Sequence, residues 1–319
     1  MALLRAISSP DGDANVDGSS LASLALAAME TEAPILKYVE FYSMTGNADK
    51  ITSPATVAGG SSRGLNDDYT PVVTSVADVD LSLRIMGDKI QTDQALSRRG
   101  FTIQDERVRQ LESFAKGLGR YFTDQMVNGT GDDSEITGLT ALITGTQRIK
   151  YGGNNGETVT LGNSDTAKSK QQKFLEALDN LILAITGGAQ LVLMNSYWLA
   201  RIKAIAREYV SISTIEAFGV KSEILMYNNV PILNSGYAKD NSSLVIPITE
   251  TLGSSTDCSS IYALRFGEKE NLTFATNKGL QVKNLGLVGV HYTTSVEMDV
   301  EQCLVDVKAA ARLEGLRLA

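Results

Sequence analysis

The chain holds one histidine in 319 residues, which is too few for the common catalytic arrangements. Serine and cysteine triads, and metal sites rich in histidine, all depend on that side chain. His291 falls on the polar face of a long alternating segment, with no nucleophile close to it in the sequence. We interpret His291 as a surface or interface residue and predict no catalytic residue.

The two cysteines, Cys258 and Cys303, are far apart and have neither a CxxC spacing nor a histidine beside them. A zinc site needs such clustered ligands, and a disulfide framework needs an oxidising compartment. We therefore predict two free thiols in a reducing cytoplasm and no metal site.

A glycine-rich segment, Gly129-Thr130-Gly131, superficially resembles a dinucleotide-binding loop. However, the third glycine is missing, and the segment follows a predicted helix where that motif requires a strand. The acidic residues Asp132, Asp133 and Glu135 do not have the alternating spacing of a calcium-binding loop. We interpret the segment as a solvated turn and predict no cofactor.

Composition indicates a large folded protein, with 43% hydrophobic and 21% charged residues. The formal net charge of −8 argues against a surface that grips phosphates, because nucleic-acid binding relies on clustered Lys and Arg. No apolar run reaches the ~18 residues of a membrane span. Acidic residues precede the apolar segment 21–29 where a signal peptide has basic ones, so we expect a cytosolic protein whose partners are proteins.

The first third of the chain predicts an arm, a helix and a two-stranded excursion. Residues 1 to about 20 are expected to be poorly ordered unless another subunit holds them. A helix over 19–30 and a strand over 35–42 follow. The segment 47–69 has no periodicity and centres on a glycine-rich stretch, 59–64, which predicts a turn between two extended arms. The returning arm alternates apolar and polar residues from Val79 to Ile85, as a half-buried strand does.

One long helix is predicted over 102–127. An apolar stripe recurs at helical spacing along one face. The stripe consists of Val108, Leu111, Phe114, Ala115, Leu118, Phe122 and Met126. Thr102 is the expected N-cap, and Asn128-Gly129 is expected to end the helix in left-handed geometry.

Later segments predict a second unit and a final long strand. Helical stripes at 174–185 and 198–205 flank a buried strand at 191–194. Asn228-Asn229 predicts a hairpin between strands at 223–227 and 230–233, with further strands at 243–248 and 260–266. From Val288 to Val300 the apolar residues fall on even positions, which predicts one long strand beside the long helix.

The order of these elements resembles the major capsid proteins of tailed bacteriophages, the Hong Kong 97-like family. In that family a spine helix ends in an Asn/Asp-Gly turn before a short Gly-Leu segment, as 128–131 and 136–139 do here. Residues 191–195, 229–233 and 261–267 resemble three further family elements, with Asn229 in place of a glycine. The tryptophan often found in the family's extended loop is absent from 46–92.

The resemblance implies an α+β Hong Kong 97-like fold with four parts. These are an N-terminal arm at 1–30, an extended E-loop at 46–92, an axial A-domain at 168–280 and a peripheral P-domain at 31–45, 93–167 and 281–319. The E-loop is expected to reach a neighbouring subunit. Its candidate interface residues are Gly59, Gly60, Arg63, Gly64, Val79, Leu81, Leu83 and Ile85.

The same resemblance implies a structural, non-enzymatic subunit that forms pentamers and hexamers of an icosahedral shell around double-stranded DNA. Its expected partners are further copies of itself, with scaffolding, portal and decoration proteins as further candidates, and packaged DNA bound without sequence specificity. Assembly is expected in the host cytoplasm and the final location in the virion capsid. Two alternatives stay open: an encapsulin shell around cargo enzymes, and an enzyme of unrecognised type.

Overall fold

The computed structural model describes residues 18–56, 59–69, 71, 73, 75–100, 102–132, 134–209, 212–217 and 220–318. The N-terminal arm predicted over the first 17 residues lies outside this part of the chain. Helix α2 (Gly18–Glu32) confirms the first predicted helix. The strand predicted over 35–42 is wrong in its first half, because Pro34 opens a 3₁₀ turn, η1 (Pro34–Lys37), and β1 spans only Phe41–Ser43.

The long helix, α4, spans Ile103–Asn128 and confirms the prediction. Leu111, Ala115, Leu118, Phe122 and Met126 are buried, so the stripe at helical spacing is the face that packs on the core. The capping of the helix at both ends differs from the prediction. The Thr102 side chain makes no capping hydrogen bond, and Gly129 leaves the helix in extended geometry with φ −54° and ψ 141° instead of a left-handed cap.

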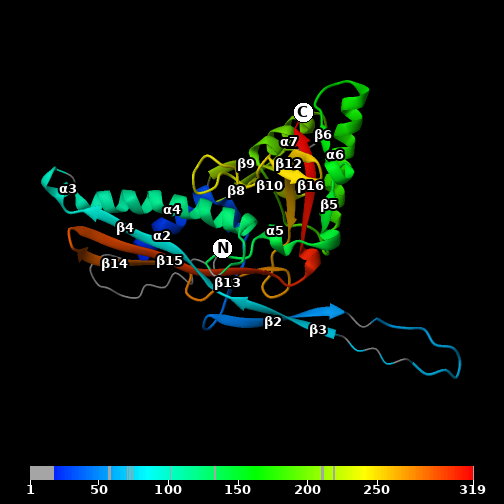
Figure 1. The fold of residues 1–319 in the computed structure, drawn as a ribbon, viewed down its shortest axis with the longest axis horizontal. Helices are drawn as coiled ribbons and strands as arrows, with labels where there is room; N and C mark the ends of the chain where they lie inside the picture. The colour runs from blue at the N-terminus through cyan, green and yellow to red at the C-terminus, as the bar shows by residue number, and fades with distance from the viewer. Residues whose placement is uncertain are drawn as a thin grey trace.

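A five-stranded sheet lies along α4 within the described residues (Figure 1). Its order is β1-β13-β15-β14, with β4 also paired to β15. The bounds are β4 Arg84–Asp93, β13 Leu272–Thr276, β14 Gln281–Val288 and β15 His291–Leu304. The long strand predicted from Val288 to Val300 is wrong at its start. Gly289, with φ +66°, turns the chain into a hairpin between β14 and β15. Val288 and Val290 are exposed.

Aromatic side chains join these layers into one core. The rings of Phe41 on β1, Phe122 on α4 and Phe274 on β13 have centroids 5.8 to 6.4 Å apart. Such tilted pairs add stabilisation beyond the area that they bury. The same cluster takes in Met29 of α2 and Val296 of β15, so α2, α4 and the sheet form a single packed unit.

A second, larger sheet has nine strands in the described residues, in the order β5-β16-β12-β7-β10-β9-β8, with β11 on β12 and β6 on β16. Its strands are β5 (Arg148–Lys150), β6 (Glu157–Val159), β7 (Leu191–Met194), β8 (Ile212–Ala217), β9 (Val220–Tyr227), β10 (Val230–Asn234), β11 (Glu250–Leu252), β12 (Ser255–Leu264) and β16 (Ala310–Leu318). Helices α6 (Asp165–Leu183) and α7 (Ser196–Tyr209) pack on it.

The hairpin at Asn228-Asn229 is confirmed, and both residues have the positive φ that such turns require. The strand predicted over 243–248 is wrong, since only one isolated bridge, Tyr237 to Leu244, forms there. The final residues divide between the sheets: β15 lies in the smaller one and β16 in the larger. Short helical turns complete the fold: α3 (Ala95–Arg98), α5 (Leu139–Leu142), η2 (Gly145–Gln147), η3 (Gly153–Asn155) and η4 (Val307–Ala309).

Candidate functional site

One hairpin projects beyond the two sheets, with its base packed against the smaller one. Strands β2 (Ala48–Thr56) and β3 (Ser75–Ser82) pair antiparallel as a two-stranded sheet, with Ile51 opposite Val79. Figure 1 shows β2 and β3 extending beyond the body of the molecule. A two-stranded hairpin is marginal by itself in water, so this one needs a surface to lie on.

The tip of the hairpin touches little of its own chain. Residues 59–69, 71 and 73 are all exposed. Gly59 and Gly60 have open space around them. Arg63 donates through Nη1 to the Asp67 carbonyl oxygen at 2.9 Å, and its guanidinium lies 5.3 Å from the centre of the Tyr69 ring. The tip is therefore held by local contacts and presents the rest of its surface outward.

Three large apolar side chains at the tip are exposed to solvent. Leu65 is 94% exposed, and Val73 and Tyr69 are also exposed. Sequence reasoning missed these three residues, because it treated the segment as a turn and weighed only its glycines and Arg63. These exposed apolar groups are therefore candidates for a contact surface.

The base of the hairpin packs on its own subunit, which corrects the expectation that the whole apolar face of β3 awaits a neighbour. Leu81 is 1% exposed and Leu83 is also buried. Together they form a small cluster with five other buried side chains and the partly buried Tyr42 and Val79. The buried members are Met44, Ile51, Ala275, Cys303 and Val305.

Ile85 departs from this pattern, since it is 73% exposed although it continues the sequence alternation. The strand is interrupted at Leu83, whose backbone N–H donates to the Asn47 carbonyl oxygen at 2.9 Å. Because side chains alternate between faces, a shift of one residue sends the following side chains to the opposite face. Met86 is buried in place of Ile85. Ile85 therefore remains a candidate contact residue, whereas Leu81 and Leu83 anchor the arm.

Polar contacts fix the angle at which the hairpin leaves the body. The Tyr42 hydroxyl donates to Asp49 Oδ2 at 2.7 Å, and this bond lowers the pKa of the Asp49 carboxyl. Lys269 Nζ lies 4.0 Å from the centre of the Tyr42 ring. Ser53 Oγ donates to the Val305 carbonyl oxygen at 2.7 Å. No sequence signal links these residues, because they come from distant segments.

The histidine and the acidic turn weighed in the sequence lie far from one another in the chain. His291 begins β15, opposite Val288 and Asp93. Thr130 donates through its backbone N–H and its hydroxyl to Glu135, and Glu135 therefore closes a turn. Asp133 lies outside the described residues. No group of three or more metal-ligating side chains occurs in the described part of the chain.

Both cysteines are free thiols, as predicted, and the structure buries them. Burial, with the Glu301 carboxylate nearby, raises the pKa of the Cys303 thiol to about 12. A thiol in such surroundings stays protonated and is a poor nucleophile. Among the helices described here, none is both long enough and apolar enough to cross a membrane.

Comparison with known proteins identifies the fold. Neither a protein-family profile nor a curated protein sequence matches this chain. The SrpI encapsulin complex from Synechococcus elongatus PCC 7942 superposes with a TM-score of 0.63 at 12% identity, over 99% of this chain and 95% of that one. The capsid of the native GTA particle gives 0.60 at 14% identity, over 98% and 95%. Mycobacterium phage Bobi gives 0.56 at 13% identity, over 88% and 89%. The chain therefore has the α+β Hong Kong 97-like capsid fold, as its sequence resemblance implied.

Proposed function

We propose that this protein is the major shell subunit of a tailed-phage capsid, assembling as pentamers and hexamers around double-stranded DNA. The observation that carries the proposal is the β2–β3 hairpin. Its base is anchored by Leu81 and Leu83, and its tip is exposed at residues 59–69, 71 and 73 in the described part of the chain. An arm built in this way is suited to lie on a neighbouring copy.

The exposed apolar groups support the same assignment. Leu65 and Val73 lie on the projecting hairpin and Ile85 lies on β4, just beyond its base, and covering them would contribute roughly 25 cal/mol for each Å² of apolar surface removed from water. Repetition around a closed shell multiplies that contribution. The anchored base supports cooperative assembly, because a rigid arm loses less conformational freedom on docking than a free one.

The roles of the four parts follow from this proposal. The E-loop, 46–92, is the contact arm, and the A-domain, 168–280, faces the axis of each pentamer or hexamer. The P-domain, 31–45, 93–167 and 281–319, links neighbouring subunits, with the arm at 1–30 as a further contact. Each boundary is a proposal, and strand β4 at 84–93 is structurally part of the sheet beneath α4.

The net charge of the chain supports a shell that encloses DNA without binding particular DNA sequences. A net charge of −8 gives the subunit no general attraction for phosphates. Portal, scaffolding and decoration proteins remain candidate partners. Assembly in the host cytoplasm agrees with two reduced, buried cysteines.

A structural role fits this chain better than catalysis. Both thiols are buried, and Asp132 and Glu135 of the Gly129 turn accept hydrogen bonds from the Thr130 hydroxyl. The solved structures with the same fold are named as capsids, phages and an encapsulin complex.

Microscopy of the purified protein combined with nuclease treatment tests the proposal. We expect closed shells, and we expect shells from infected cells to retain nuclease-resistant double-stranded DNA. Shells that hold a cargo enzyme and no DNA would support the encapsulin alternative. A protein that forms no shell in any buffer, with or without a scaffold, would contradict both.

A further inference from the structure

A second group of exposed apolar side chains lies where β14 turns into β15. Leu285, Leu287, Val288 and Val290 are all exposed. Outside this group and the hairpin tip, the large exposed apolar residues of the described chain occur singly on separate elements or loops: Ile85, Leu161, Leu183, Tyr197, Tyr237 and Val307. Single apolar residues at a surface are ordinary, whereas a cluster is a candidate for a contact surface. We call the four residues at this turn the distal patch.

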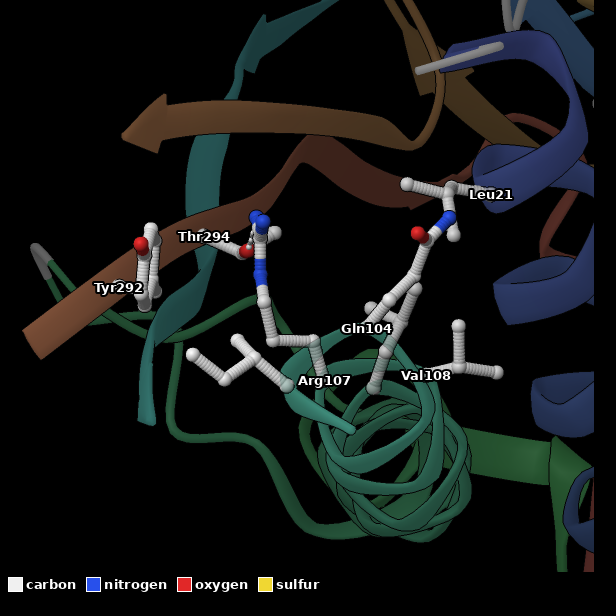
Figure 2. Close-up of a pocket in the computed structure, with 8 residues that line it drawn as sticks. Leu21, Gln104, Arg107, Val108, Tyr292 and Thr294 are labelled. Atoms are coloured by element: carbon white, nitrogen blue, oxygen red, sulfur yellow. Dashed lines mark hydrogen bonds between the residues drawn. The ribbon is translucent and has the colours of Figure 1, made fainter. Parts of the chain in front are cut away.

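A groove of about 340 Å³ adjoins the distal patch, between the start of α4, the start of α2 and strand β15 (Figure 2). Tyr292, which lies opposite Leu287 in the β14–β15 ladder, lines this groove. The apolar lining also includes Leu21, Val108 and Leu111. The distal patch therefore leads into the groove through the pair of Leu287 and Tyr292.

Arg107 is the one charged side chain among the described residues that line the groove. Figure 2 shows it extending from α4 toward Thr294 and Tyr292 on β15. Its Nη2 donates to Thr294 Oγ1 at 2.9 Å and to Asn284 Oδ1 at 2.8 Å. Its Nε is shielded from solvent and has no hydrogen-bond partner in the described part of the chain. Because a buried donor without an acceptor is costly, an acidic group would suit the groove beside apolar ones.

We propose that the distal patch and its groove receive the β2–β3 hairpin tip of a second copy of this chain. The tip carries three exposed apolar residues and an exposed acidic pair, which are Leu65, Tyr69, Val73, Asp67 and Asp68. The apolar side chains would cover the patch, and a carboxylate would accept a hydrogen bond from Arg107. Such charge-assisted bonds are among the stronger ones in proteins. This inference rests on the proposed function, because it names the surface on which the arm lies.

The two surfaces lie at opposite ends of the molecule. Figure 1 shows the turn from β14 to β15 near α3 at one end of the long axis, and the tip residues 59–69 at the other end, beyond β2 and β3. The tip of one copy therefore cannot cover the distal patch of the same copy. A contact between two different surfaces repeats head to tail, and it closes into a ring when the rotation between copies allows. Rings of this kind fit the pentamers and hexamers of the proposed function.

Disulfide formation between copies of the full-length protein tests the proposal. Two single variants, Leu65→Cys at the tip and Leu287→Cys in the distal patch, are mixed before assembly, and both native cysteines are buried. The matched control mixes Leu65→Cys with Leu183→Cys, which replaces an exposed leucine on α6. Oxidation by copper phenanthroline and oxygen joins two thiols, and their two protons and two electrons pass to the oxygen.

In assembled shells we expect the Leu287→Cys mixture to form covalent dimers roughly tenfold faster than the control mixture, because docking raises the effective concentration of one thiol beside the other. Adding Asp67→Lys and Asp68→Lys to the tip variant should slow this reaction roughly threefold, since the acidic pair would no longer attract Arg107. An unchanged rate in that variant would overturn the pairing of the tip with Arg107.

Equal rates for the two mixtures in assembled shells would overturn the proposal. Dimers that form as fast from either the tip variant or the patch variant alone would also overturn it, since each surface would then contact its own kind. Microscopy of the same samples separates two kinds of failure. Shells without a disulfide between positions 65 and 287 would contradict this contact alone, whereas the absence of shells would contradict the proposed function as well.

Discussion

Gly119 of α4 lies directly against the backbone of Met29 in α2. A Cβ atom on Gly119 would be 2.7 Å from the Met29 carbonyl oxygen and 3.3 Å from its Cα. The two helices approach this closely because the glycine has no side chain. The other glycine inside α4, Gly117, has nothing within 4 Å of the position that a Cβ would take.

These two glycines make a matched pair for mutation. Gly117→Ala should raise the free energy of unfolding by up to about 1 kcal/mol, since alanine has the higher helix propensity. Gly119→Ala should lower it by about 1 to 3 kcal/mol, because the added methyl group forces the helices apart. Urea unfolding of both variants measures the difference. Equal stabilisation by the two would show that α2 does not pack as described.

A second pair tests which residues of the hairpin belong to the subunit's own core. Leu81→Thr should lower the free energy of unfolding by about 2 to 4 kcal/mol, since it leaves a cavity and buries a hydroxyl. Ile85→Thr should change it by less than about 0.5 kcal/mol, because Ile85 is exposed. Thermal unfolding followed by circular dichroism compares them. A large loss in the Ile85 variant, or none in the Leu81 variant, would reverse the assignment of anchor and contact.

Cys303 should make stability fall in alkaline solution. Burial raises the pKa of its thiol to about 12, so the folded state keeps a proton that the unfolded state releases from about pH 9 upward. The contribution is fully present below the unfolded pKa and declines by up to about 1.4 kcal/mol per pH unit above it. Urea unfolding of wild type and Cys303→Ala at pH 8 and pH 10 isolates the effect. Identical pH dependence in the two proteins would contradict it.

Ionic strength should promote assembly. Copies that each carry a charge of −8 repel one another, and the Debye length shrinks from ~30 Å at 0.01 M salt to ~8 Å at 0.15 M. Light-scattering assembly curves should therefore rise faster as salt is added. Curves that slow steadily with salt would show that attraction between oppositely charged patches dominates the contacts.

Much of the architecture follows from local patterns in the sequence. The stripe through Leu111, Leu118 and Phe122 has a helical period over enough turns to specify α4, and Asn228-Asn229 tolerates the positive φ of a tight turn. These signals involve residues close together in the chain, so they can be recognised without tertiary structure.

Predictions failed where a strand breaks within an unbroken alternation, or where a contact joins distant segments. Apolar and polar residues alternate from Leu81 to Ile85 in the sequence. However, the strand is interrupted at Leu83, between β3 and β4, and the side chain of Ile85 therefore lies on the opposite face. Val288 and Val290 also continue an apolar alternation, but Gly289 turns the chain there. The contact between Lys269 and Tyr42 joins segments that no local pattern relates.

Sedimentation velocity of the wild-type protein beside a variant that lacks Ser61–Asp68 tests the central claim most directly. These residues are exposed and contribute little to the subunit's own fold. We predict that wild type sediments as closed shells, whereas the shortened protein keeps its circular dichroism spectrum and sediments only as small species. Normal shells from the shortened protein, or a strictly monomeric wild type in every buffer, would contradict the account.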